Sequence, residues 1–257
     1  MDLNQNVNEN VDTGTLRIHL TNESNGTPVQ GAKISISYTG NPSQTIEEVS
    51  ADDSGNSEEL TLNAPPLEYS MEPSEEHQPY AEYTIRVQAP GYRDITVSAI
   101  NVLPGETAIQ NVRMEAEDAP GDRIDMVVIA AHTLYAEYPP KIPEDEIKPM
   151  NESGEIVLSR VVIPEYIVVH DGAPGDTTAS DYYIRYRDYI KNVASSEIYA
   201  TWPDAAIRAN VLAIMSFTLN RVYTEWYRNK GKDFTITSST AYDQKWINGR
   251  NIFESIS

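Results

Sequence analysis

The first part of the chain alternates apolar and polar residues in short runs. The runs are "TLRIHL" (15–20), "KISISY" (33–38), "EYTIRVQA" (82–89), "RDITVSAI" (93–100) and "AIQNVRM" (108–114). A period of two places successive side chains on opposite faces of a strand, and turn-forming stretches such as "ADDSGN" and "LPGE" separate the runs. The pattern predicts an antiparallel β-sandwich over residues 14–115, preceded by a polar, flexible tail at 1–13.

The pattern changes at residue 116. Residues 116–155 are acidic and turn-rich, and "YAEYPPKIPEDEIKP" holds four of the 16 prolines. Proline fits neither a helix interior nor a central strand. We therefore expect an extended, partly polyproline-like linker that proteases can reach.

Residues 156–257 return to strand and helix patterns. "GEIVLSRVVIPEYIVVHDGAP" (154–174) and "DFTITSST" (233–240) predict strands, with a polar loop, "GDTTASDYY", after the first. Two helices are expected, over 185–198 and 203–228, with Thr201 as the N-cap of the second. The whole chain is thus expected to be a multidomain α+β protein.

Glu197 interrupts the apolar stripe of the first predicted helix. Helical spacing places it on the same face as Ile190, Val193 and Ala194. An ionised carboxylate is costly on such a face unless it is paired, whereas a carboxyl that stays protonated near neutral pH can donate a proton. The alternative is a structural glutamate paired with Arg208 or Lys191.

Composition excludes several classes of function. The net charge of −20 over 257 residues disfavours binding to nucleic acids or to anionic membranes. The absence of cysteine excludes disulfides and thiolate metal sites. No apolar run is long enough to span a membrane, and "MDLNQNVNEN" lacks the features of a signal peptide, so we expect synthesis inside the cell. The four histidines, which lack metal-ligand spacing, are expected at the surface or in turns: His19, His77, His132 and His170. No metal and no cofactor is predicted.

The predicted sandwich carries the motifs of a known fold. "GTPVQGAKISI", "DDSGN" and "YTIRVQAPGYRDITV" resemble the carboxypeptidase-regulatory-like, or transthyretin-like, domains. The resemblance implies a β-sandwich over residues 14–115 without chemistry of its own. Such domains serve as spacers, pro-segments or adhesion units.

The helical segment resembles an enzyme family. "YIKNVASSEIYATWPDAAIRANVLAIMSFTLN" is similar to the catalytic segment of the stage II sporulation protein D-like lytic transglycosylases. Glu197 falls on the catalytic glutamate of that family. Within the family, the chain resembles the spore cortex-lytic enzymes of anaerobic spore formers. These are proenzymes that a subtilisin-like serine protease activates, and they degrade the spore cortex peptidoglycan during germination.

The sequence also departs from the family pattern at several positions. Met215 stands where the family often has arginine, and Tyr242 and Asp243 stand where it often has His-Cys. Complete members continue with the second part of the catalytic domain. Residues 156–257 are therefore expected to be the first part of a transglycosylase domain, inactive alone, with the activation region inside residues 116–155. The expected location is the spore cortex or coat region.

The family chemistry requires a single carboxyl group. It protonates the glycosidic oxygen as a general acid and then, as a carboxylate, takes the proton from the C6 hydroxyl of the same sugar, which closes a 1,6-anhydro ring. Most glycoside hydrolases instead use two carboxyl groups. Glu197 is the residue that the sequence offers for this role.

Four further residues are candidates for substrate binding. Tyr199 and Trp202 are expected to stack on sugars, although Trp202 also suits a hydrophobic staple at the start of the second helix. Asp243 and Gln244 are candidate substrate contacts, with a solvated loop as the alternative. The competing function is a non-catalytic interaction or cell-wall-binding module that carries a degenerate catalytic remnant.

Overall fold

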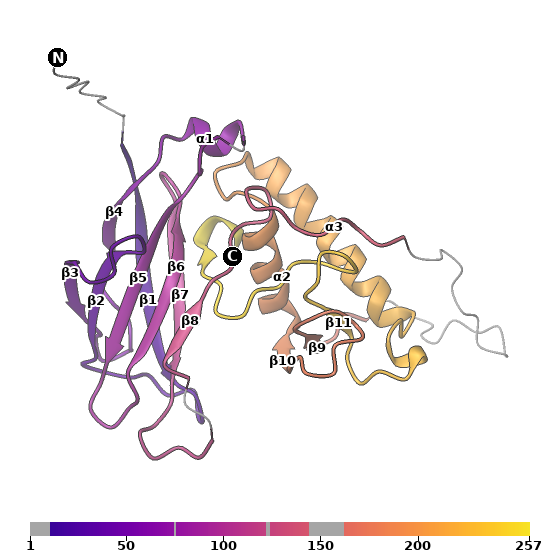
Figure 1. Ribbon diagram of the computed structural model, residues 1–257, viewed down its shortest axis with the longest axis horizontal. Helices are drawn as coiled ribbons and strands as arrows, with labels where there is room; N and C mark the ends of the chain where they lie inside the picture. The colour runs from indigo at the N-terminus through magenta and orange to yellow at the C-terminus, as the bar shows by residue number, and fades with distance from the viewer. Residues whose placement is uncertain (1–10, 75, 122–123, 144–161) are drawn as a thin grey trace.

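The computed structural model describes residues 11–74, 76–121, 124–143 and 162–257. These residues are mostly β-sheet, and they form three sheets and few helices (Figure 1). Two of the sheets form a sandwich, and a smaller part of the chain carries two long helices and a short sheet. The expectation of a mixed chain with an N-terminal sandwich is confirmed at this coarse level.

The sandwich is built from a four-stranded and a five-stranded sheet. The four-stranded sheet has the order β12-β7-β1-β4, formed by Ile252–Phe253, Thr107–Met114, Asp12–Asn22 and Leu60–Ala64. The five-stranded sheet has the order β3-β2-β5-β6-β8, formed by Thr45–Ser50, Lys33–Tyr38, Ala81–Gln88, Ile95–Val102 and Met126–Val128. Each predicted alternating run became one of these strands.

The expectation of a purely antiparallel sandwich was wrong. Strand β1 pairs in parallel with β7, and β6 pairs in parallel with β8. Parallel neighbours cannot be joined by a tight hairpin, so such pairs come from segments that are separated along the chain. Local periodicity carries no information about pairings of this kind.

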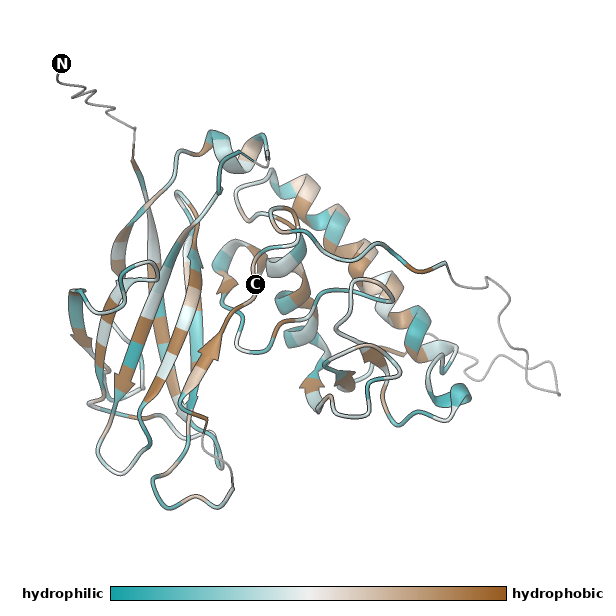
Figure 2. Ribbon diagram, viewed as in Figure 1, coloured by the Kyte–Doolittle hydropathy of each residue, from teal (hydrophilic) through white to brown (hydrophobic). Residues whose placement is uncertain are grey.

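Alternation in the sequence corresponds to alternation in burial. In β1, Leu16, Ile18 and Leu20 point into the core and are at most 1 % exposed, while the residues between them are partly exposed. Figure 2 shows the same alternation of hydrophobic and hydrophilic residues along the strands. Strand β6 differs, because all of its residues except Thr96 are buried.

The helical part follows the predicted order of elements. The third sheet has the order β10-β9-β11, formed by Asp181–Arg185, Tyr166–His170 and Ile236–Thr237. Helices α2 (Tyr186–Glu197) and α3 (Asp204–Tyr223) lie between β10 and β11 in the chain. Short helical turns occur at α1 (Glu68–Met71), η1 (Arg228–Lys230) and η2 (Glu254–Ile256). Strand β10 begins inside the stretch that we expected to be a polar loop.

The ends of α3 differ from the prediction. The N-cap is Pro203, without a side-chain capping bond, while the Thr201 hydroxyl donates to the Ser70 hydroxyl at 2.9 Å. The helix ends at Tyr223 rather than at 228, because Glu225 has a φ of 45°, which is incompatible with helix continuation. One side of the helix packs against a second core, which lies in the helical part of the chain, and Ile207 and Ile214 are buried there.

The two parts of the chain share an interface, at which residues from the second part are buried in the core of the sandwich. Strand β12, from the end of the chain, pairs with β7 of the sandwich. The Asn251 side chain accepts from Asn101 N at 3.1 Å and donates to Asn101 O at 3.0 Å. Tyr199, Ile247 and Phe253 belong to the sandwich core. The end of the chain therefore completes the sheet that the first half begins.

Part of the segment expected to be a linker is integrated into the fold. Strand β8 lies in it, and Ile129 is buried in the sandwich core. Residues 144–155 of the expected linker lie outside the described residues. Within the described ranges, no helix has the length and apolar character needed to cross a bilayer.

Candidate functional site

Glu197 is the last residue of α2. The helix ends there because Ile198 adopts an extended conformation, with a φ of −135° and a ψ of 149°. The Glu197 side chain is half-buried, and its Oε1 accepts a hydrogen bond from the Lys245 backbone N–H at 2.6 Å. The carboxyl group thus lies between the end of α2 and the loop that precedes β12.

Burial controls the protonation of this carboxyl group. Desolvation raises the pKa of Glu197 above its ordinary value, and the Lys245 N–H and the Lys141 ammonium group offset part of that rise. Arg208, one of the partners considered, instead pairs with Asp204 at 2.8 Å. The arrangement favours a carboxyl group that holds a proton at higher pH than an exposed glutamate does.

Residues from outside α2 hold the end of the helix. The carbonyl groups of a last helical turn have no partner within the helix. Here the Arg250 guanidinium donates to Ser195 O at 3.1 and 2.7 Å, and the Thr133 N–H and hydroxyl donate to Ser196 O at 3.1 and 2.9 Å. The backbone that carries Glu197 is therefore fixed from two directions.

The loop before β12 is docked against α2 by an amide side chain. Asn192 Nδ2 donates to Ile247 O at 2.8 Å, and Asn192 Oδ1 accepts from Ile247 N at 2.9 Å. Together with the Lys245–Glu197 bond, these contacts attach residues 245–247 to one side of α2. Glu197 is thus part of a rigid contact.

A segment from the predicted linker reaches the same place. Lys141 Nζ donates to Tyr242 O at 3.2 Å and to Asp243 O at 2.8 Å, and Ile142 N donates to Ala241 O at 2.7 Å. The Lys245 ammonium group lies 5.4 Å from the centre of the Tyr138 ring. Residues 138–142 therefore lie against the loop that contacts Glu197.

His132 is buried beside the end of α2, so a surface position is excluded for it, while the turn role is confirmed because its carbonyl oxygen accepts from Tyr135 N and Ala136 N, both at 3.0 Å. It is 2 % exposed, its Nε2 donates to Ile198 O at 3.3 Å, and its Nδ1 accepts from Leu134 N at 3.2 Å. This pattern requires the neutral ring. Burial, together with the nearby Arg250, lowers the pKa of His132 well below its usual value. His170 is likewise buried, with its Nδ1 2.7 Å from Asp181 Oδ1.

We expect the neutral state of His132 to make folding pH-dependent. The unfolded chain binds a proton at this residue below about pH 6.5, whereas the folded chain does not. The contribution of His132 to the free energy of unfolding should therefore be fully present above about pH 6.5. Below that pH the free energy of unfolding should decline, by up to about 1.4 kcal/mol per pH unit. Denaturant unfolding between about pH 7 and pH 5 would measure this slope.

The control is a matched pair of variants. His132→Gln keeps a donor and an acceptor but removes the titration, so its slope should be shallower than that of the wild type. His77→Gln, at an exposed ring stacked on Tyr69, should keep the wild-type slope. Equal slopes in all three proteins would contradict the prediction.

The two aromatic candidates lie in packed surroundings. Tyr199 is fully buried and stacks on His132 with ring centres 4.3 Å apart, so it cannot reach a sugar in this structure. Its hydroxyl has no hydrogen-bond partner among the described residues. Trp202 is half-buried, its Nε1 donates to Ser70 O at 2.9 Å, and its ring packs against both cores. It anchors the helical part to the turn at α1.

Asp243 and Gln244 fit neither of the two expectations. They are 4 % and 6 % exposed, so they belong neither to a solvated loop nor to an open substrate groove. Gln244 Oε1 accepts from the Thr218 hydroxyl at 2.8 Å, and Asp243 pairs with Arg221 at 2.7 Å. Both side chains tie the loop to α3, since burial of polar groups requires such partners.

The residues that sequence reasoning missed are mainly buried charges. Arg250 is 5 % exposed and caps α2, yet "NGRNIF" has no pattern that predicts this role. Arg221 was part of the predicted second helix, and its buried pairing with Asp243 depends on the tertiary fold. Within the described ranges, no group of three or more metal-ligating side chains occurs.

Comparisons with known proteins do not assign the chain to a family. No family model and no curated protein matches it. Among solved structures, the Bacillus anthracis TIE protein is 23 % identical over 41 % of this chain and 17 % of that protein, with a TM-score of 0.28. A minor pilin of Streptococcus agalactiae is 10 % identical over 44 % of this chain and 48 % of that one, with a TM-score of 0.30.

The wild-type catechol 1,2 dioxygenase of Acinetobacter radioresistens is 15 % identical over 46 % of this chain and 58 % of that one, with a TM-score of 0.29. This chain therefore covers less than two thirds of each of the three structures. None of the three is named as a spore cortex-lytic enzyme. At these TM-scores the likenesses carry no argument about function.

Proposed function

We propose that the chain is the precursor part of a peptidoglycan lytic transglycosylase that degrades the spore cortex during germination. Glu197 serves as the single general acid and then as the base. One observation carries the proposal: a half-buried carboxyl group with a raised pKa stands at the end of α2, on the residue that the family resemblance indicates. Residues 156–257 then correspond to the first part of an α/β catalytic region.

The hydrogen bond to Glu197 suits both steps of the reaction. Because Oε1 accepts the Lys245 N–H, the proton of the neutral acid belongs on Oε2. Oε2 gives this proton to the glycosidic oxygen as the bond from that oxygen to C1 breaks. It then takes the proton of the C6 hydroxyl, whose oxygen bonds to C1. The Lys245 N–H and the Lys141 ammonium group stabilise the carboxylate between the two steps.

The proenzyme character is part of the same proposal. Residues 132–142 lie within residues 116–155, the segment expected to hold the activation region, and contact both the end of α2 and the loop at 241–243. In this arrangement they hold the Glu197 region closed until a subtilisin-like serine protease acts. The partners are thus the cortex peptidoglycan and that protease, in the spore cortex or coat region.

A cut between residues 143 and 162 should not separate the two pieces. Strand β12 belongs to the sheet of the sandwich, and Ile247 and Phe253 are buried in its core, which stabilises the contact by about 3 to 6 kcal/mol. With a specific protease site placed in this interval, the cut pieces should elute together in size-exclusion chromatography and separate in denaturant.

A variant at the interface tests the cause. Phe253→Glu places a charge in the core and should weaken the association of the cut pieces, whereas Ser216→Ala should not, because Ser216 is exposed and its hydroxyl donates to Leu212 O within α3. Separation of the unmodified pieces under native conditions would mean that the shared core does not hold them together.

The second candidate function is a non-catalytic module with a degenerate remnant. It is favoured by the burial of Tyr199, Asp243 and Gln244, which leaves these residues unavailable to a substrate. Two cavities of about 220 and 410 Å³ are present, and Glu197 lines neither of them. Release of anhydro-muropeptides from cortex fragments distinguishes the two functions. It should be measured on this chain and on a longer polypeptide that includes the rest of the catalytic domain.

A further inference from the structure

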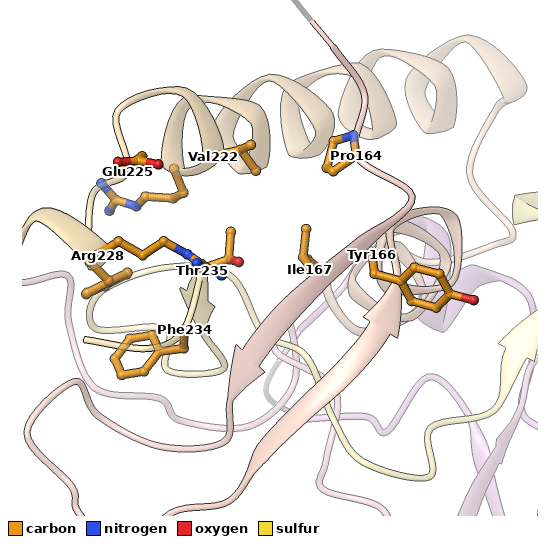
Figure 3. Close-up of a pocket in the computed structure, with 10 residues that line it drawn as sticks. Pro164, Tyr166, Ile167, Val222, Glu225, Arg228, Phe234 and Thr235 are labelled. Atoms are coloured by element: carbon orange, nitrogen blue, oxygen red, sulfur yellow. The ribbon is translucent and has the colours of Figure 1, made fainter. Parts of the chain in front are cut away.

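A small cavity of about 220 Å³ lies where α3 ends, beside strand β9 (Figure 3). Its volume is below the range of about 300 to 1,000 Å³ for pockets that hold drug-sized ligands, so it suits a smaller molecule. One part of its lining is apolar and consists of Pro164, Ile167, Val222 and Phe234. The cavity is separate from Glu197, which is not among its lining residues.

Two opposite charges line this cavity without meeting. Glu225 and Arg228 both contribute to it, and in the described part of the chain neither side chain has a hydrogen bond or an ion pair. Glutamate and arginine three residues apart on a helix normally attract each other. Here α3 has ended at Tyr223, before both residues, and the pair is not formed. Arg221, which also lines the cavity, is engaged by Asp243.

The conformation of Glu225 adds to this observation. Its φ of 45° is in the left-handed region, which glycine adopts without strain and a residue with a side chain does not. The chain therefore carries a carboxylate at a position where glycine would be less strained. The helix break also brings Arg228 to the opposite side of the turn, where its side chain extends toward Thr235 in Figure 3.

The remaining polar group is the Thr235 hydroxyl. Its oxygen accepts from Val168 N at 3.2 Å, so its hydrogen is available for donation. The cavity thus offers an anion-binding side, formed by Arg228 and Thr235, and a cation-binding side, formed by Glu225. A simple anion would leave Glu225 unpaired, and a neutral sugar would leave both charges unpaired.

We propose that this cavity binds a zwitterionic α-amino acid group. The ligand carboxylate pairs with Arg228 and Thr235, its ammonium group pairs with Glu225, and its side chain packs on Ile167 and Val222. The group could belong to a free amino acid or to the diamino acid of a peptidoglycan stem peptide. The second source rests on the proposed function, whereas the first does not.

The test compares probes that differ by one charge. Leucine carries both charges, 4-methylpentanoate lacks the ammonium group, and 3-methylbutylamine lacks the carboxylate. When the 257-residue chain is titrated with leucine and binding is monitored by calorimetry or by NMR chemical shifts, the binding should be saturable. Each of the other two should bind at least about tenfold more weakly. The reason is that a hydrogen bond to a charged group contributes more free energy than a tenfold change in Kd requires. Titration with meso-diaminopimelate tests the stem-peptide source.

Variants locate the site and separate it from catalysis. Arg228→Gln and Glu225→Gln should each weaken leucine binding about tenfold, while Lys232→Gln, a nearby change outside the cavity lining, should leave it unchanged. Circular dichroism would confirm that the variants fold. Glu197→Gln should bind leucine normally, so failure of the catalytic proposal would not affect this result. Absence of binding by both amino acids, or equal binding of the three leucine-like probes, would overturn the inference.

Discussion

Glu197→Gln should reduce cortex peptidoglycan cleavage by about 100-fold or more in an activated polypeptide that includes the complete catalytic domain. Glutamine keeps the size of the side chain and can still accept the Lys245 N–H bond, but it has no proton to transfer. General acid–base catalysis is typically worth about 100-fold to 10,000-fold. The measurement is the rate at which anhydro-muropeptides appear.

The matched control is Asp188→Asn. Asp188 is exposed on the same helix, so the same chemical change there should leave turnover unchanged. In the unmodified enzyme, the protonated acid is lost as the pH rises above the raised pKa of Glu197, so turnover should fall on the alkaline side. Turnover of Glu197→Gln within a few-fold of normal would exclude this carboxyl group as the acid.

The strands of the sandwich could be predicted because their information is local. Burial of Leu16, Ile18 and Leu20 on one face of β1 is already visible as a period of two. The same holds for α2, whose observed span of Tyr186–Glu197 is close to the predicted 185–198. A repeated hydrophobic pattern requires only that one side of an element be buried.

The pairings that join the two parts of the chain could not be predicted. Strand β12 is Ile252–Phe253, too short to show a period, and its partner β7 lies far away in the sequence. Strand β8 was hidden in a segment whose acidic, turn-rich and proline-containing sequence predicted a linker. Each of these strands forms because it pairs with the edge strand of a sheet, β7 for β12 and β6 for β8. The local sequence pattern does not show which strand is at the edge of a sheet.

The candidate site was visible only in part. Glu197 stood out because a carboxyl group on an apolar stripe requires an explanation. The groups that position its backbone did not stand out, because Arg250 and Thr133 act through hydrogen bonds to carbonyl oxygens. Asp243 was noticed for its place in a family motif, yet its environment is that of a buried structural carboxylate.

The buried ion pair between Arg221 and Asp243 should be among the strongest single contributions to stability. The side chains are 3 % and 0 % exposed, and the Asp243 carboxylate also accepts from the Tyr227 hydroxyl at 2.6 Å and from Thr237 N at 2.9 Å. Arg221→Met leaves this carboxylate without its counter-charge. We expect a loss of about 3 to 5 kcal/mol in the free energy of unfolding.

A double-mutant cycle measures the interaction energy between Arg221 and Asp243 separately from the effect of each single change. Asp243→Leu alone leaves the Arg221 guanidinium group buried among aromatic rings, 4.5 Å from the centre of the Trp226 ring, and should also cost about 3 to 5 kcal/mol. The double variant Arg221→Met with Asp243→Leu should cost clearly less than the sum, because both single changes remove the same contact. Arg208→Met, which breaks the exposed pair with Asp204, should cost less than about 1 kcal/mol. If denaturant unfolding showed additive losses, or a loss at Arg221 as small as that at Arg208, the loop at Asp243 would owe its position to other contacts.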